Sequence, residues 1–152
     1  MSERVPALIF SVRDSTYGLI QRDDTTLLPW LQRYAQPGPV PGVPSWVLGL
    51  LNVQGTVQAI VDLGAFLGSG VSTPTDMTRL IFVEHGALCI GLLVDSASGV
   101  RYLDDGVISD DSAEFLVSGK AMVGQRPVQI LDGGGLVQSL MRALDTGKLG
   151  RA

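Results

Sequence analysis

The alternation of apolar and polar positions is clearest along residues 49–63, where it predicts a β-hairpin that runs into a short helix. Apolar residues flank a polar turn centred on Gly55, and glycine adopts the positive φ of such a turn at little cost. Asp62 stands where a helix N-cap is expected, and Gly68 marks the end of that helix. The apolar positions of the hairpin are Leu51, Val53, Val57 and Val61. Nothing in the segment is typical of a catalytic site, so we interpret it as scaffold.

Parts of this pattern recur about seventy positions apart, as expected of a structural unit used twice. The Leu-Ile-Phe of residues 8–10 returns at 80–82, and residues 57–62 are echoed by 128–132. A Gly-Leu pair follows each Leu-Ile-Phe copy after a polar turn. The sequence therefore predicts two similar β-rich subdomains, each ending in a helix capped by Asp62 or Asp132. The alternative is that unrelated antiparallel domains share such short fragments.

Residues 29–44 hold five of the eight prolines and predict a stiff connector, because proline resists both helix and central strand. A proline-rich ligand for aromatic-lined domains is the alternative. Further hairpins are expected over 77–95 and 121–131, followed by a C-terminal helix that ends at Gly147. The apolar face of this helix is Leu136, Val137, Leu140, Met141 and Leu144.

These elements predict one domain over residues 5–147. Its first subdomain is expected over 15–75 and its second over 76–131, and an exchange of terminal segments between them is left open. Residues 148–152 are expected to form a disordered tail.

Composition and charge narrow the classes of partner. No apolar run approaches the roughly 20 residues that span a bilayer, and the first residues lack a signal-peptide pattern, so a cytoplasmic protein without membrane insertion is expected. Cys89 is the single cysteine, which excludes an intrachain disulfide and fits a reducing compartment. A net charge of −4 argues against nucleic-acid binding. Charged residues are only 17%, below the typical ~25%, which favours either protein partners or a glycine-rich chain with neutral loops.

Motifs of the common enzyme classes are missing from the sequence, so we expect no catalytic residues, cofactor or metal. His85 lies in a predicted hairpin turn and is interpreted as a surface residue. Cys89 lies between apolar neighbours and is interpreted as buried and inert. The acidic pairs at 104–105 and 110–111 do not have calcium-loop spacing. The glycines at 133–135 lack a lysine partner and are interpreted as a flexible entry to the last helix.

Residues 44–63, with the sequence PSWVLGLLNVQGTVQAIVDL, resemble the hallmark segment of the CheW-like family. Residues 81–84 and 90–95, a hydrophobic step at Val100 and the closing strand at 128–132 also resemble the family pattern. The resemblance implies two five-stranded β-barrel subdomains side by side. It also implies a non-enzymatic adaptor that couples transmembrane chemoreceptors to a histidine autokinase, whose regulatory domain has the same fold. The receptor tip would use an apolar groove between the subdomains, and the kinase would use the barrel ends.

The sequence departs from the family pattern at several positions, so the resemblance is to a divergent member. Gln54 stands where the family has an arginine, so a fixed charge and a bidentate donor are lost. Ala59 replaces a proline, Thr26 stands near a position that is commonly acidic, and the connector at 29–44 is longer than usual. These changes predict altered partner preference and leave the fold intact.

Two groups of residues are candidates for partner binding, with barrel core as the alternative for their valines and leucines. The first hairpin supplies Leu50, Asn52, Gln54 and Val57, and the second half supplies Leu92, Val94 and Val100. Trp46 is either an anchor or a plug for a barrel end. Three other functions stay open: an adaptor of a pilus or twitching-motility pathway, a small-molecule-binding β-barrel sensor, and an enzyme assembled around His85 and a distant carboxylate.

Overall fold

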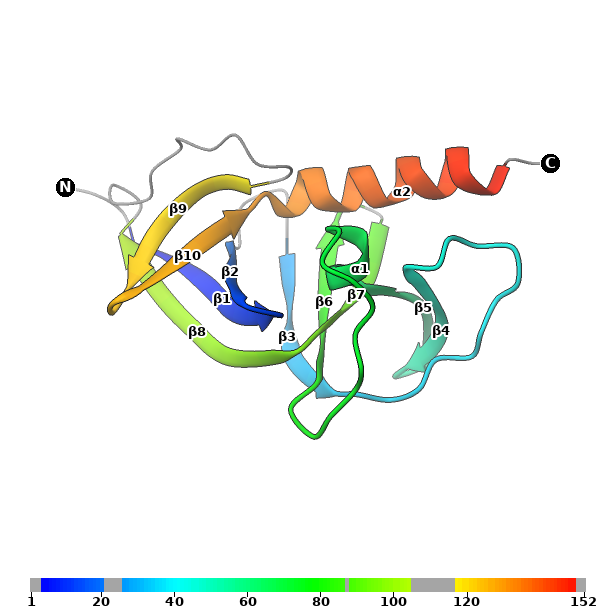
Figure 1. Cartoon of the computed structure of the whole chain (residues 1–152), viewed down its shortest axis with the longest axis horizontal. Helices are drawn as coiled ribbons and strands as arrows, with labels where there is room; N and C mark the ends of the chain where they lie inside the picture. Colours follow the sequence, from blue (N-terminus) through cyan, green and yellow to red (C-terminus); the bar gives the residue numbers. More distant parts are fainter. Residues whose placement is uncertain (1–3, 21–25, 87, 105–116, 150–152) are drawn as a thin grey trace.

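The computed structural model describes residues 4–20, 26–86, 88–104 and 117–149, which form ten strands and two helices (Figure 1). The prediction of a mainly β protein with short helices and a C-terminal helix is confirmed. No helix among these described residues is long and apolar enough to cross a membrane. The strands are β1 Arg4–Val12, β2 Ser15–Ile20, β3 Thr26–Arg33, β4 Val47–Val53, β5 Thr56–Asp62, β6 Arg79–His85, β7 Leu88–Val94, β8 Ser96–Asp104, β9 Val117–Val123 and β10 Arg126–Leu131. The helices are α1 Leu63–Phe66 and α2 Gly133–Leu149.

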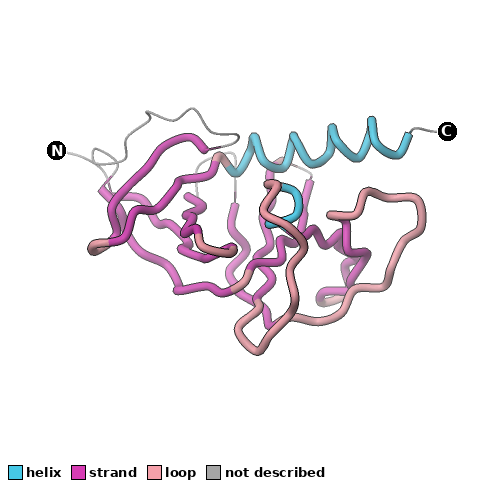
Figure 2. The backbone as a smooth tube through the Cα atoms, in the orientation of Figure 1, coloured by secondary structure: helices cyan, strands magenta, loops and turns pink. Residues whose placement is uncertain are grey.

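The strands form two curved five-stranded sheets, as Figures 1 and 2 show. The first sheet has the order β8-β1-β2-β10-β9 and the second has the order β3-β6-β7-β5-β4. Position by position, the two sheets have the same pairing: antiparallel throughout, except for the parallel pairs β2–β10 and β7–β5. The predicted duplication into two five-stranded, barrel-like units is therefore confirmed.

The two repeats are intertwined. The first repeat contributes β1 and β2 to the first sheet and β3, β4 and β5 to the second sheet, and the second repeat does the converse. The sheets therefore do not follow the expected division into 15–75 and 76–131, because each repeat completes its sheet with strands from the other. The exchange involves more of the chain than the terminal segments. The outer limits of the domain at 5 and 147 stay a prediction.

Two glycines make the exchange sterically possible. Gly18 pairs with Ile130 in the first sheet, and Gly91 pairs with Ile60 in the second. A Cβ atom at Gly91 would lie 2.6 Å from Cδ1 of Ile60, and one at Gly18 would lie 3.1 Å from Cδ1 of Ile130. The Gly-Leu echo in the sequence thus marks the sites where the strands of the two repeats pack most closely.

Three apolar clusters follow from this arrangement. One lies within each sheet, and the largest lies between the sheets, where β1, β2, β6 and β7 meet both helices. Because this largest cluster draws on both repeats, neither sheet can be removed without exposing the apolar face of the other. Its largest fully buried members are Phe10, Leu19, Leu63, Ile81, Ile90, Leu92, Leu131, Leu136 and Leu140.

The helices begin in the same way. The Asp62 side chain accepts a hydrogen bond from the Ala65 backbone N–H at 3.2 Å, and Asp132 accepts one from Gly135 at 3.2 Å. Both aspartates are therefore N-caps, as predicted. The glycines at 133–135 belong to the helix itself and are not a flexible entry to it.

Two boundaries predicted from the sequence were wrong. Helix α2 continues through Leu149, past its expected end at Gly147, so the expected tail at 148–152 is helical in its first two residues and otherwise lies outside the described residues. Pro29 lies inside β3, so the connector is shorter than expected. Strand β3 is an edge strand with an irregular register around this residue, and both features tolerate a missing N–H.

Replacing Gly91 by alanine is expected to destabilise the fold by about 1–3 kcal/mol, because the added methyl group overlaps Ile60 and Phe82 in a packed core. Urea unfolding followed by circular dichroism measures this change. Gly18→Ala is the matched comparison, since its nearest neighbour is 3.1 Å away and the strain is smaller. An equal or greater loss in Gly18→Ala would contradict this account.

Candidate functional site

The β4–β5 hairpin turns through two residues with positive φ, Gln54 at 53° and Gly55 at 88°. This is the geometry of a type I′ turn, which matches the twist of the flanking strands. The Asn52 side chain accepts a hydrogen bond from the Gly55 backbone N–H at 2.9 Å. Asn52 therefore holds the turn that projects Gln54 into solvent.

One side of this hairpin is an exposed apolar surface, which we call the β4–β5 face and define by Leu50, Asn52, Val57 and Ala59. Cross-strand pairing places Leu50 opposite Ala59 and Asn52 opposite Val57, so all four side chains share one side of the sheet. Leu50 is 45% exposed and Val57 is 61% exposed. The structure thus brings together Leu50, Asn52 and Val57 of the first candidate group, with Gln54 at the tip.

The outer edge of β4 is covered at one point by the connector. Gly38 and Leu50 exchange two backbone hydrogen bonds, of 2.8 and 2.9 Å. Gly49 has a φ of 141°, and a Cβ atom there would overlap the Gly38 carbonyl oxygen. Since Leu50 already uses its backbone groups in this way, a partner would contact the β4–β5 face through side chains.

Leu92 and Val94 are fully buried in the cluster between the sheets. They belong to β7, a central strand of the second sheet, which is covered by the other sheet and by α2. The expectation that they contact a partner was wrong, and the alternative of barrel core applies to both.

Val100 is 57% exposed and lies on β8, beside Tyr102 at 62%. Strand β8 is an edge of the first sheet, and Figure 1 places it at the opposite end of the molecule from β4 and β5. Val100 and the β4–β5 face therefore form two separate surfaces. Sequence reasoning missed Tyr102, which lies two residues after Val100 on β8 and therefore on the same side of the strand.

Trp46 is partly buried and packs against the apolar cluster between the sheets. Its ring meets Phe66 edge to face with centroids 4.9 Å apart, and its backbone carbonyl accepts a hydrogen bond from the Asp62 N–H at 2.8 Å. The tryptophan thus packs the short helix α1 against the start of β4.

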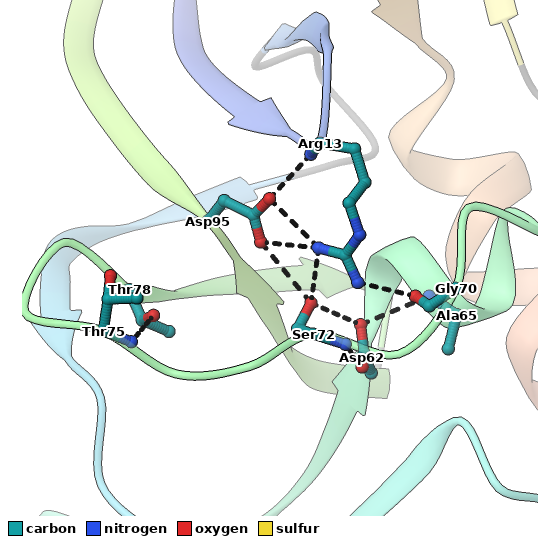
Figure 3. A network of polar contacts seen from close by, with 8 residues as sticks. All are labelled: Arg13, Asp62, Ala65, Gly70, Ser72, Thr75, Thr78 and Asp95. Carbon is teal, nitrogen blue, oxygen red and sulfur yellow. Dashed lines mark hydrogen bonds and ion pairs between the residues drawn. The ribbon is translucent and has the colours of Figure 1, made fainter.

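A polar network ties the first sheet to the second (Figure 3). The Arg13 guanidinium contacts the Asp95 carboxylate at 2.9 Å and donates to the Gly70 carbonyl at 2.8 Å. Ser72 donates through its hydroxyl to Asp62 at 3.0 Å and through its backbone N–H at 2.8 Å. Arg13 comes from the β1–β2 turn and Asp95 from the point where the chain passes between the sheets. Sequence reasoning missed this pair, since 82 positions separate its members.

His85 ends β6 and is half-buried, so it is less exposed than predicted. Its ring packs on the start of α2, where a Cβ atom at Gly134 would lie 2.8 Å from the imidazole Cε1. Its Nε2 lies 3.4 Å from the Gln138 side-chain nitrogen. No group of three metal-binding side chains occurs among the described residues.

Cys89 is half-buried on β7. Burial raises the pKa of its thiol above the ordinary value, the nearby Glu84 carboxylate raises it further, and a hydrogen bond with Gln58 opposes the rise. A raised pKa leaves less thiolate near neutral pH, which agrees with the interpretation of Cys89 as inert.

Alkylation of Cys89 by iodoacetamide is expected to be slow at pH 8, because only the thiolate reacts. The midpoint of the pH–rate profile is expected above that of the same chain unfolded in urea, since unfolding removes both burial and the Glu84 charge. Mass spectrometry of quenched samples measures the rates. A folded-state midpoint equal to or below the unfolded one would refute the assignment.

Removing the Arg13 side chain is expected to lower the free energy of unfolding by about 1–2 kcal/mol, because Asp95 loses a charge-assisted partner at a partly exposed site. The loss should shrink in 1 M salt. Urea unfolding of Arg13→Ala measures it, with Asp14→Ala as the control for a charge change in the same turn. A salt-independent loss, or the same loss in the control, would argue against the ion pair as its source.

The family model of the CheW-like domain matches residues 6–141 of this chain. Protein PilI of Pseudomonas aeruginosa is 40% identical over 70 residues, which are 46% of this chain and 38% of that protein. Chemotaxis protein CheW of Rhizobium meliloti is 37% identical over 67 residues, which are 44% of this chain and 43% of that protein. These matches span less than half the length of either relative.

The scaffolding protein TtCheW of Thermoanaerobacter tengcongensis has a similar crystal structure. The two folds superpose with a TM-score of 0.74, covering 87% of this chain and 86% of that chain, at 22% sequence identity. This likeness extends the shared fold over both sheets.

Proposed function

Because this chain belongs to the CheW-like domain family, we propose that it is a non-enzymatic adaptor of a chemotaxis-type signalling pathway, coupling a chemoreceptor to a histidine autokinase. The relatives named chemotaxis protein and the structural neighbour named scaffolding protein support this function. An adaptor needs shaped surfaces and no reacting groups. The described residues offer such surfaces at both ends of the molecule.

The observation that carries the proposal is the exposed apolar β4–β5 face. Two apolar side chains, Leu50 and Val57, stand on neighbouring strands with their exposed fractions at about half. Contiguous exposed apolar surface that is framed by polar groups is typical of a protein interface. We assign this face to the regulatory domain of the kinase, with Asn52 and Gln54 as its polar frame, and we assign the surface around Val100 to a second partner.

Gln54 adjusts the choice of partner in this proposal. It occupies a turn position that the fold holds rigidly, so its side chain is presented at the same place that an arginine would be. An amide offers one acceptor and two donors without a charge, whereas an arginine offers a fixed charge and a planar fork. A partner surface that pairs with Gln54 therefore has no need of a carboxylate.

Binding to the regulatory domain of the host's histidine autokinase is expected to be micromolar or tighter and to weaken at least about tenfold in Val57→Asp, which places a charge in the centre of the face. Isothermal titration calorimetry measures the change. Met77→Asp is the control, since Met77 is similarly exposed but lies in the 67–78 linker. An equal loss in both variants, or no binding by the unaltered protein, would refute this assignment.

The variant Gln54→Arg tests whether glutamine at this turn has changed the kinase that the protein binds. The measurement compares binding of the unaltered protein and of the variant to the same kinase domain. If only the variant binds this kinase domain, the natural partner is a different kinase that complements glutamine. The match with Protein PilI favours a pilus-dependent motility pathway as that second candidate. The same titration against the kinase of such a pathway tests it.

We further propose a cytoplasmic location and no membrane insertion, as an adaptor between a receptor's cytoplasmic tip and a kinase requires. The family model and the scaffold-like fold support this location.

A further inference from the structure

The outer strands of the two sheets differ in how they are protected against pairing with another strand. The first sheet ends in β8 and β9, and the second ends in β3 and β4. An outer strand exposes N–H and C=O groups, and native proteins place charged residues or proline there to discourage strand addition. Such residues are Arg101 and Asp104 in β8, Lys120 in β9, and Pro29 and Arg33 in β3. Strand β4, with the sequence VLGLLNV, has neither a charge nor a proline.

Strand β4 also directs backbone groups toward its open edge. The two-residue turn of the β4–β5 hairpin makes Val53 and Thr56 the first hydrogen-bonded pair, so Leu50 and Asn52 direct their N–H and C=O groups away from β5. The Leu50 side chain is 45% exposed, so an added strand would bury apolar surface as well as form hydrogen bonds. This edge therefore fits an extended strand.

A short piece of the connector occupies this edge, and we call it the strap and define it as Pro37, Gly38 and Pro39. Figure 1 shows the connector at the outer side of β4. The Gly38 N–H donates to the Leu50 carbonyl at 2.8 Å, and the Gly38 carbonyl accepts from the Leu50 N–H at 2.9 Å. A Cβ atom at Gly49 would overlap the Gly38 carbonyl oxygen and lie 3.2 Å from Cα of Pro39. The close approach of the strap therefore depends on a glycine in β4.

The two prolines of the strap prevent it from becoming a new open edge. Gly38 and Leu50 form an antiparallel bridge, so the backbone groups of Pro37 and Pro39 point away from β4. Proline has no N–H, and the outward side of the strap thus offers no donor at either position. A further strand cannot form a regular ladder there. The strap adds one pair of hydrogen bonds to β4 and ends the sheet.

We propose that the strap closes the β4 edge against strand addition by a second copy of this chain. The competing occupant is another β4, because identical strands pair antiparallel about a twofold axis and an uncharged β4 meets no repulsion from its own copy. Such pairing would use the backbone groups of Leu50 and Asn52 in both copies. The strap prevails because it is tethered to the same chain, which gives it a high effective concentration at the edge.

Two substitutions at one position test the strap. Gly38→Pro replaces the N–H by a ring carbon that lies against the Leu50 carbonyl, so the strap is expected to leave the edge. Gly38→Ala is the matched control, since it keeps the N–H and its Cβ atom would lie 3.7 Å from the Leu50 carbonyl oxygen, an ordinary contact. Sedimentation velocity at several protein concentrations measures self-association. Gly38→Pro is expected to self-associate at least about tenfold more tightly than Gly38→Ala or the unaltered protein.

Hydrogen exchange of single amides locates the contact. In the unaltered protein the Leu50 amide is expected to exchange at least about tenfold more slowly than the Asn52 amide, because Leu50 donates to the strap. In dilute Gly38→Pro the Leu50 amide is expected to lose this protection, and at high concentration both amides are expected to gain it as two β4 strands pair. Leu50→Lys added to Gly38→Pro places a charge on each pairing strand and is expected to restore the monomer.

The proposal is overturned if Gly38→Pro, shown to be folded by circular dichroism, loses protection at Leu50 and stays as monomeric as the unaltered protein. Equal self-association of Gly38→Ala, unchanged Leu50 protection in Gly38→Pro, or self-association that survives Leu50→Lys would also overturn it. The unaltered protein tests the closed edge even if Gly38→Pro does not fold. A Leu50 amide that exchanges as fast as that of Asn52 would exclude the strap as the cover of this edge.

Discussion

The parallel pairing of β2 with β10 and of β7 with β5 is the contact on which the rest of this structure depends. Each pair joins a strand of one repeat to a strand of the other, and each has a glycine where an isoleucine side chain crosses it. With any larger residue at Gly91, the neighbouring Ile60 and Phe82 side chains would be displaced and the packing at this pair would be weakened. The close packing of two backbones at these glycines is therefore what allows two similar units to share one chain in alternation.

This exchange explains the position of the polar network. The chain passes from the second sheet to the first at Asp95, which lies between β7 and β8. At that crossing the Asp95 N–H donates to the Ser11 carbonyl at 2.9 Å, and its carboxylate pairs with Arg13. One guanidinium nitrogen of Arg13 donates to both carboxylate oxygens of Asp95. These two hydrogen bonds hold both the position and the orientation of Asp95 at the point where the chain passes from one sheet to the other. The apolar cluster between the sheets supplies most of the attraction, and this network sets the register of one sheet against the other.

Much of the local structure could be predicted from the sequence because its causes are local. The hairpin turn needs Gly55, each helix needs an N-cap at Asp62 or Asp132, and both signals lie within a few residues of their effect. The exchange of strands could not be predicted in this way, since alternation shows that a strand has a buried side but not which strand lies beside it. Leu92 and Val94 illustrate a signal that could have been used for the site: they stand in the continuous apolar run of residues 90–94, which is typical of a strand that is covered on both sides, and the structure buries both. The candidates on the edge hairpin, Leu50 and Val57, are exposed because one side of this hairpin faces solvent, and their contact with a partner stays a prediction.

A duplicated fold presents each of its surfaces twice, and in this chain the two copies of the hairpin surface carry different side chains. The positions that shape the fold keep the same residue in both repeats, as the glycines at 18 and 91 and the N-cap aspartates at 62 and 132 illustrate, because a change there would disturb strand packing or a helix start. The equivalent surface positions have no such constraint, and Leu50 in one repeat corresponds to Lys120 in the other. If both faces had stayed apolar, the molecule would present two equivalent docking surfaces and could join its partners in an open chain. Because Lys120 and Gln129 occupy the positions that Leu50 and Ala59 hold in the other hairpin, the two hairpins present different chemistry to a partner, and this difference makes the two docking surfaces distinguishable.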